Sequence, residues 1–181
     1  MQYDIPMRND NEGLVMALQI VQAASLAHIE TTRDLFNQYA ASLNFNLCFQ
    51  SFEQELASLP GDYAPPDGRL LLALWEGEPA GCGALHKFVA GKSAAQQTDD
   101  AICEMKRLYV KPETRGHGIG LALAQRLIGE ARQIGYRRMR LDTIPDSMAA
   151  AVKMYRGLGF GEIAAYRANP VPGAIFMELE L

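Results

Sequence analysis

The sequence predicts an α+β fold, in which a mixed, mostly antiparallel central sheet of about seven strands carries about four helices on its faces. Two patterns alternate along the 181 residues. Runs with apolar residues at every second position predict strands, and runs with apolar residues three and four positions apart predict helices. In the middle, a strand, a glycine-rich turn, a helix and another strand follow one another, which predicts a right-handed crossover between parallel neighbours.

The first part of the chain predicts one strand and two helices. Apolar residues at period two indicate the strand, and hydroxyl side chains ahead of helical patterns are typical N-caps. The expected elements are a loose polar lead-in at 1–13, a strand at about 16–24, a helix capped by Thr31 or Thr32 that runs through Leu43, and a helix at 52–59 capped by Ser51.

The next part predicts an antiparallel hairpin and then the strand that enters the crossover. Gly77 makes the hairpin turn, and Gly81 and Gly83 inside the second strand predict a bulge or a close backbone approach. Pro112 ends the third strand because proline cannot donate a ladder hydrogen bond. The expected elements are strands at 70–76, 80–88 and 101–110, with a polar loop at 91–100.

The last part predicts two helices and three strands. Gly135 and Gly159 stand where helices end, and Pro145 stands where one begins. Polar residues expected on the outer face of the first helix are Arg126, Glu130, Arg132 and Gln133. The expected elements are a helix at 119–134, a strand at 139–143, a helix at 145–158, a strand from 160, and a terminal strand at 175–181, whose exposed edge would allow a homodimer.

Length and composition suit one soluble domain over 1–181. The start shows no basic and apolar leader, and the longest apolar run, 70–75, is too short to span a bilayer, so no membrane partner is expected. Cys48, Cys82 and Cys103 stand apart, with no C-x-x-C spacing. We therefore expect a cytoplasmic protein without a bound metal or a disulfide framework.

The charge is uneven along the chain. The net charge is −4, yet residues 101–140 hold nine Lys or Arg against three Asp or Glu. A nucleic-acid binder would explain a basic block, but the chain as a whole is acidic and has no aromatic RNA-binding motif and no helix-turn-helix. A compact phosphate ligand explains the block better, although most of these side chains are expected simply to solvate exposed faces.

The basic block surrounds the stretch 115–120, which reads Arg-Gly-His-Gly-Ile-Gly. Glycine lets the backbone bend sharply and lie bare against a ligand. The first N–H groups of the following helix lack internal partners and attract anions. A dinucleotide-binding turn is the alternative, but Leu121 occupies the position of its third glycine and no βαβ unit opens the chain. The stretch therefore predicts an anion cradle.

Three motifs over 101–162 resemble the GNAT N-acetyltransferases. Residues 115–120 match that family's acyl-CoA motif, Arg/Gln-x-x-Gly-x-Gly/Ala, and 105–112 look like the strand before it. Tyr155-x-x-x-Gly159-Phe160 resembles the end of the family's fourth helix. The resemblance implies a GNAT-like fold and an acetyl-CoA-dependent N-acetyltransferase that acts on a primary amine of a small molecule or peptide. One departure is Met148, where many members carry an asparagine that helps to hold CoA; Asp146 or Ser147 could substitute for it.

The resemblance also implies roles for individual residues. The glycine turn would hold the CoA pyrophosphate and the preceding strand would guide the pantetheine arm, whose amides can add to a strand edge. The implied donor-binding residues are Leu108, Tyr109, Val110, Arg115, Gly116, His117, Gly118, Ile119 and Gly120. Leu108 and Val110 also suit an ordinary core.

Two residues are candidates for proton transfer. Tyr155 would protonate the departing CoA thiolate, or else it is a buried aromatic with a satisfied hydroxyl. Glu104 would act as the base, directly or through a water, because an alkyl ammonium must lose a proton before it attacks. The alternative for Glu104 is an ion pair with Lys106 or Arg107. By period two, Glu104 is expected to share a strand face with Lys106, Leu108 and Val110.

The acceptor is not specified by any motif. Its pocket is expected from 28–66, 88–100 and 166–173, with Phe45, Phe49, Tyr63, Tyr166 and Arg167 as lining residues. Direct attack in a ternary complex is favoured, because no Cys-His-Asp spacing supports a covalent acyl-enzyme. The rival hypothesis is a non-catalytic acyl-CoA sensor.

Overall fold

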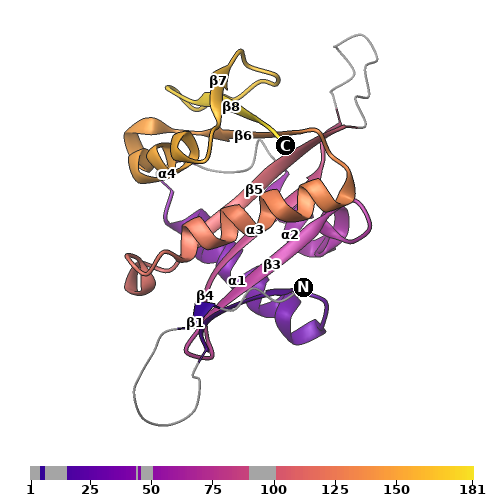
Figure 1. The fold of residues 1–181 in the computed structure, drawn as a ribbon, viewed down its shortest axis with the longest axis vertical. Coiled ribbons are helices and arrows are strands. Elements are labelled where there is room, and N and C mark those ends of the chain that lie inside the picture. Colours follow the sequence, from indigo (N-terminus) through magenta and orange to yellow (C-terminus); the bar gives the residue numbers. More distant parts are fainter. Residues whose placement is uncertain (1–4, 7–15, 44, 46–50, 90–100) are drawn as a thin grey trace.

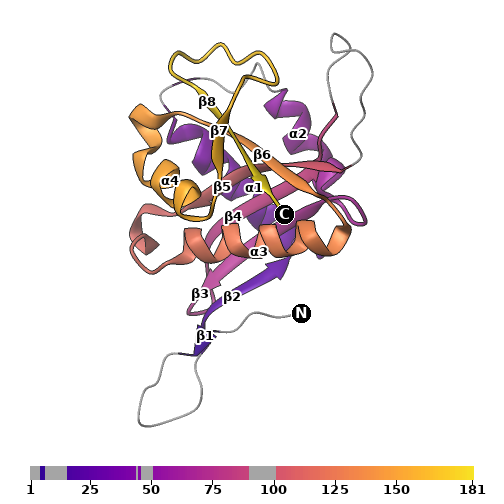
Figure 2. The ribbon, with the colours of Figure 1, turned by 45° about the horizontal axis from the view of Figure 1, so that its top comes forward.

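The structure, a computed structural model, describes residues 5–6, 16–43, 45, 51–89 and 101–181. Its strands form one sheet (Figures 1 and 2) in the order β1-β2-β3-β4-β5-β6-β8-β7. The strands are β1 (Ile5–Pro6), β2 (Met16–Gln22), β3 (Arg69–Trp75), β4 (Glu78–Lys87), β5 (Ile102–Val110), β6 (Arg138–Thr143), β7 (Gly161–Ile163) and β8 (Ile175–Glu180). The helices are α1 (Leu26–Ala41), α2 (Phe52–Ser58), α3 (Ile119–Ile134) and α4 (Pro145–Gly157).

The α+β class and the mixed, mostly antiparallel sheet are confirmed. Strands β5 and β6 pair in parallel, and the other neighbours pair antiparallel. From β2 onward the elements follow the predicted order. The sheet has eight strands because Ile5–Pro6, within the expected lead-in, pairs with β2; the rest of that lead-in and the predicted loop at 91–100 lie outside the described residues.

The sheet separates two hydrophobic cores. One face packs against α3 and α4, through side chains such as Leu123, Leu127 and Tyr155. The other face packs against α1 and α2, through side chains such as Phe36 and Phe52. Figure 1 shows α3 crossing in front of the strands while α1 and α2 lie behind them. Each helix therefore buries its apolar stripe against one side of the sheet.

The predicted start of the first helix is wrong. The helix begins at Leu26, because the hydroxyl of Ser25 caps it by accepting a hydrogen bond from the N–H of His28, at 3.2 Å. The hydroxyls of Thr31 and Thr32 instead donate to carbonyls four residues earlier, each at 2.8 Å. The residue that marks the helix start is thus Ser25, six residues before the predicted cap Thr31.

Ser51 precedes α2 as predicted, but it does not cap it. Its φ is 55°, and its side chain makes no capping hydrogen bond. Glu130, expected on the outside of α3, is buried instead. Its carboxylate accepts hydrogen bonds from Arg69 at 2.6 Å and from Arg126 at 2.8 Å. This pairing with a side chain of β3 removes the cost of burying the charge.

The terminal strand is not a free edge. β8 lies between β6 and β7 and pairs with both of them. β7 covers the outer side of β8 at Phe176, Met177 and Glu178, so that part of the strand is not an open edge, and the possible homodimer stays a prediction.

Candidate active site

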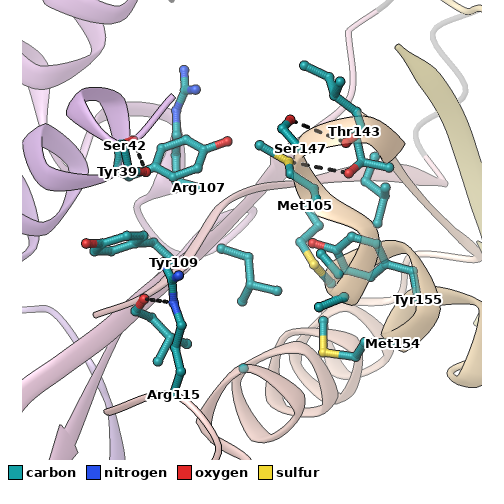
Figure 3. A pocket seen from close by; sticks show the side chains of 18 of the residues that line it. Tyr39, Ser42, Met105, Arg107, Tyr109, Arg115, Thr143, Ser147, Met154 and Tyr155 are labelled. Atoms are coloured by element: carbon teal, nitrogen blue, oxygen red, sulfur yellow. Dashed lines mark hydrogen bonds between the residues drawn. The ribbon is translucent and has the colours of Figure 1, made fainter. Parts of the chain in front are cut away.

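The site begins where the parallel pair of strands opens. β5 and β6 pair at Ile102, Cys103 and Glu104, and no further pairing joins them beyond Glu104. Between the separating strands lies a cavity of about 620 Å³, which also reaches α1, the start of α3, and α4 (Figure 3). Beyond the opening, β5 offers an unoccupied edge to an extended, amide-containing ligand.

The glycine turn closes one end of this cavity. Gly116 and Gly118 have φ of 89° and 76°, a backbone conformation that glycine adopts without strain. Among the described residues, no hydrogen bond engages the N–H groups of 116–118, and those of 119–121 form the unpaired first turn of α3. The guanidinium of Arg115 donates to the carbonyl of Val110 at 3.1 Å, which fixes the turn against β5.

The predicted donor-binding residues come together, with one exception. Leu108, Tyr109 and Val110 line the same cavity as the turn. The side chain of His117 lies outside it, stacked on Trp75 with 4.7 Å between ring centroids.

A β-bulge at Arg107 divides strand β5 into two parts. Arg107 has a φ of 57°, and two residues of β5 stand opposite Gly83 alone. The bulge predicted for the second hairpin strand is a different one: Ala80 is the extra residue of β4 opposite Ala73 and Leu74 of β3, and it is confirmed. The predicted close approach is also confirmed, because a Cβ on Gly81 would lie 2.6 Å from the carbonyl oxygen of Tyr109.

The bulge overturns the predicted strand face. Glu104 and Lys106 precede the extra residue, so they share a face with each other but not with Leu108 and Val110. Leu108 and Val110 pack toward α3, whereas Tyr109 packs toward α1. Strict alternation fails because the inserted residue shifts the phase by one.

Tyr155 reaches the cavity from α4 and is 7% exposed. Figure 3 shows its hydroxyl directed into the cavity, facing that of Tyr39 from α1. Burial raises the pKa of Tyr155, and burial also raises the pKa of Tyr39 to about 12. Both phenols therefore stay protonated at neutral pH and can donate hydrogen bonds. The ring of Tyr155 also packs on Phe160. Tyr155 is therefore both a buried aromatic, as the alternative predicted, and a residue whose hydroxyl reaches the cavity.

Glu104 is 1% exposed and held by several partners. It accepts hydrogen bonds from Tyr166 at 2.7 Å and from Arg167 at 3.1 Å, and His86 lies 3.2 Å away. Burial alone would raise the pKa of Glu104, but the His86 hydrogen bond and the charges of Lys106 and Arg167 lower it to about 2. Glu104 forms an ion pair with Arg167, which the sequence did not indicate, and the charge of the predicted partner Lys106 also acts on it.

Arg107, the other predicted partner of Glu104, pairs with Glu55 of α2. Its guanidinium donates two hydrogen bonds to that carboxylate, at 2.9 and 2.5 Å. The hydroxyl of Tyr63 donates to the same carboxylate at 2.7 Å. These bonds fix α2 against the bulge.

A second cavity of about 550 Å³ lies beside the first, bounded by α2, β4, β5 and the segment after β7. Tyr63 and Arg167 line it, while Phe45 lines the first cavity, so these three predicted acceptor residues fall in cavities. Phe49 lies outside the described residues. The remaining members of the second cavity that carry charge or can titrate are Glu55, Asp62, His86, Glu104 and Lys106.

One charged residue of the first cavity, Asp142, was not indicated by the sequence, whereas Asn169 belongs to the predicted segment 166–173. Asp142 of β6 accepts hydrogen bonds from Arg167 at 2.5 Å and from Asn169 at 2.7 Å. Both Asp142 and Asn169 line the cavity. A charged residue inside an otherwise apolar-alternating strand was the available signal for Asp142.

Met148 stands on an irregular turn of α4. Its φ and ψ are −129° and 34°, and its sulfur accepts a hydrogen bond from Thr143 at 3.5 Å. Ser147 lines the cavity and Asp146 does not, so Ser147 is the better placed of the two possible substitutes for the family's asparagine.

The described residues contain no cluster of three or more His, Cys, Asp or Glu side chains suited to a metal ion. Within the same ranges, no helix has the length and apolar character needed to cross a membrane.

Solved structures share this fold. A GNAT acetyltransferase from Staphylococcus aureus superposes with a TM-score of 0.70 at 18% identity, covering 91% of this chain and 99% of that one. A structure from Salmonella typhimurium that contains its cofactor acetyl-CoA superposes with a TM-score of 0.64 at 20% identity, covering 91% and 94%. The fold is therefore of the GNAT class, as the sequence predicted.

Residues 30–160 match the acetyltransferase (GNAT) family, and the chain belongs to that family. An uncharacterized N-acetyltransferase of Schizosaccharomyces pombe is 37% identical over 148 residues, which cover 81% of this chain and 85% of the relative. An uncharacterized N-acetyltransferase of Dictyostelium discoideum is 31% identical over 218 aligned positions, covering 92% and 100%.

Proposed function

We propose that this protein transfers the acetyl group of acetyl-CoA to a primary amine of a small molecule or peptide, by direct attack in a ternary complex. The observation that carries the proposal is the opening between β5 and β6, which ends at a turn of unpaired N–H groups. A ligand with an extended amide-rich arm and a diphosphate fits both features, and acetyl-CoA has both.

The donor is assigned to the backbone of two adjoining segments. Leu108, Tyr109 and Val110 would pair with the pantetheine arm as an added strand does. The turn from Arg115 to Gly120 would receive the pyrophosphate, because N–H groups at a helix start attract anions. A Cβ at Gly116 or Gly118 would meet nothing within 4 Å, so the cradle is open to a ligand.

The chemistry is assigned to two positions on either side of the thioester. Tyr155 would give its phenolic proton to the CoA sulfur as the C–S bond breaks. Loss of the acceptor's proton is assigned to the polar cluster around Glu104, the base that the sequence predicts. A cytoplasmic location fits the isolated cysteines, of which Cys82 and Cys103 are buried thiols.

Calorimetry with CoA and acetyl-CoA tests the donor, and thiol release over alkyl amines, amino acids, polyamines and peptides tests the transfer. We expect both CoA forms to bind and at least one amine to release CoA in an enzyme-dependent way. If neither CoA form binds, the proposal is wrong. If both bind and no acceptor releases the thiol, the protein is a sensor rather than an enzyme.

A further inference from the structure

The two cavities have almost entirely different lining residues. Glu104 lines only the second cavity and Tyr155 only the first. Among the residues of the described chain that line the two cavities, Lys106 alone lines both. It lies on β5 just beyond the point where that strand leaves β6, and it is 9% exposed.

We propose that Lys106 is the base that takes the proton from the acceptor's ammonium group, and that the second cavity is the route by which this proton leaves. The inference rests on the proposed N-acetyltransferase activity. Lys106 is suited to the role by position, because a base must stand within reach of the amine and also have access to water.

The contacts of Glu104 make it a poorer acceptor for the proton than Lys106. One of its carboxylate oxygens accepts from Tyr166 at 2.7 Å, and the other meets His86 at 3.2 Å and Arg167 at 3.1 Å. Each oxygen thus already has at least one hydrogen-bond partner that stabilises its negative charge, and Glu104 does not line the donor cavity. Its role becomes one of position, since its charge lies beside Lys106.

The basicities support the same assignment. Burial lowers the pKa of Lys106 to about 8, although Glu104 and Asp142 raise it in part, while Glu104 itself titrates near 2. An alkyl ammonium titrates near ~10.4. Transfer to Lys106 therefore crosses a difference of about 2 in pKa, and transfer to Glu104 one of about 8. The charged and titratable groups around Lys106 are Glu55, His86, Glu104, Arg107, Asp142 and Arg167.

The protons and bonds balance in this scheme. The ammonium gives one proton to the neutral amine of Lys106, and the nitrogen lone pair forms the C–N bond to the thioester carbon. The C–S bond breaks, and the CoA sulfur takes the proton of Tyr155. The second proton of the attacking nitrogen restores Tyr155. One proton in total leaves through Lys106 to the water of the second cavity.

Two nucleophiles of equal size test the role. Methylamine must lose a proton before it attacks, whereas hydroxylamine is already unprotonated near neutral pH. We expect Lys106→Met to lower kcat/KM about 100-fold or more with methylamine and only a few-fold with hydroxylamine, with acetyl-CoA affinity unchanged. Lys106→Arg, which keeps the charge but cannot deprotonate, should behave in the same way. The matched control is Lys153→Met, on an exposed position of α4, which should match the wild type.

The possible outcomes test the role of Lys106 separately from the proposed N-acetyltransferase activity. Equal losses with both nucleophiles, or full methylamine activity in Lys106→Arg, would make Lys106 a structural cation. If Lys106→Met does not fold, Lys106→Arg decides. In the wild type, kcat/KM for methylamine should inflect near pH 8, and a profile without that inflection contradicts the proposal. Wild-type protein that binds acetyl-CoA but acetylates neither probe nor any panel amine contradicts the proposed function itself.

Discussion

The proposed site has two halves, one for the donor and one for the acceptor, and they are built from different groups. The donor half is a continuous stretch, from Leu108 to Gly120, and it offers mainly backbone N–H groups and an open strand edge. The acceptor half is made of side chains from α2, β4, β5, β6 and the segment after β7, joined in ion pairs. A site made of backbone groups depends on the conformation of the chain and tolerates exchange of its side chains. A site made of ion pairs depends on the identity of its side chains.

Tyr155→Phe tests whether donor binding and chemistry separate as this comparison requires. We expect kcat to fall by about 10²–10⁴, the usual contribution of a general acid, because phenylalanine cannot protonate the thiolate. Calorimetric affinity for acetyl-CoA should stay within about two-fold of wild type, since the contacts of the donor are with the backbone. If kcat is unchanged in Tyr155→Phe, Tyr155 is not the general acid and serves only in packing.

Glu55→Gln tests how far the acceptor half depends on pairing. The Arg107 side chain is 2% exposed and would keep its charge without a counter-ion. Breaking a buried pair in this way costs about 3–5 kcal/mol, measured as the loss in free energy of unfolding by urea. The control is Glu30→Gln, whose partner is Arg33 on an exposed helix face and whose loss should cost about 0.5 kcal/mol or less. Equal effects of the two changes would contradict the comparison.

Acid should weaken the acceptor half first. The folded pKa of Glu104 is lowered to about 2 from 4.5, so its contribution to stability is present above pH 4.5 and is lost as the pH falls toward 2. The loss amounts to about 3 kcal/mol at most, at 1.36 kcal/mol for each unit of pKa. Unfolding measured from neutral pH downward should show Glu104→Gln less stable at pH 7 and converging with wild type at low pH. A constant gap would show that Glu104 acts through packing alone.

Gly118→Ala tests the donor half, where conformation matters. An alanine at a φ of 76° costs about 1–2 kcal/mol, and the strained turn should bind acetyl-CoA several-fold more weakly. Gly129→Ala in the same helix is the matched control: it meets nothing within 4 Å and should stabilise the helix by about 0.5–1 kcal/mol without changing affinity. Parallel effects of the two alanines would show that the turn's geometry is not what binds the donor.

The difference between the halves also explains what the sequence could predict. The donor half follows from spacing, because positive-φ glycines and a helix start must be adjacent in the chain. The order of the elements along the chain, the bulge in β4 and the extent of α3 were likewise local inferences that the structure confirms. The partners of Glu104 could not be predicted, since Arg167 lies 63 residues away and only the fold brings it close.

Two errors had the same local cause. A hydroxyl residue can cap a helix or bond back to it, and here Ser25 caps α1 while Thr31 bonds back to the carbonyl of Ala27. Period two predicts a strand face only while no residue is inserted, and Arg107 is such an insertion. In both cases the element itself was predicted correctly. The residue at which the helix starts, or at which the alternation shifts, was not.

The bulge at Arg107 also divides β5 into two segments whose side chains lie in different parts of the site. Before it, Glu104 and Lys106 line the second cavity and Met105 lines the first, whereas Leu108, Tyr109 and Val110 after it line only the first. If Arg107 were removed, Leu108 would lie opposite Gly83 and Tyr109 would stay opposite Cys82, so the later side chains would keep their faces while the bulge and the pair with Glu55 would be lost. The bulge thus stands between the part of β5 that reaches the second cavity and the part that lines only the first.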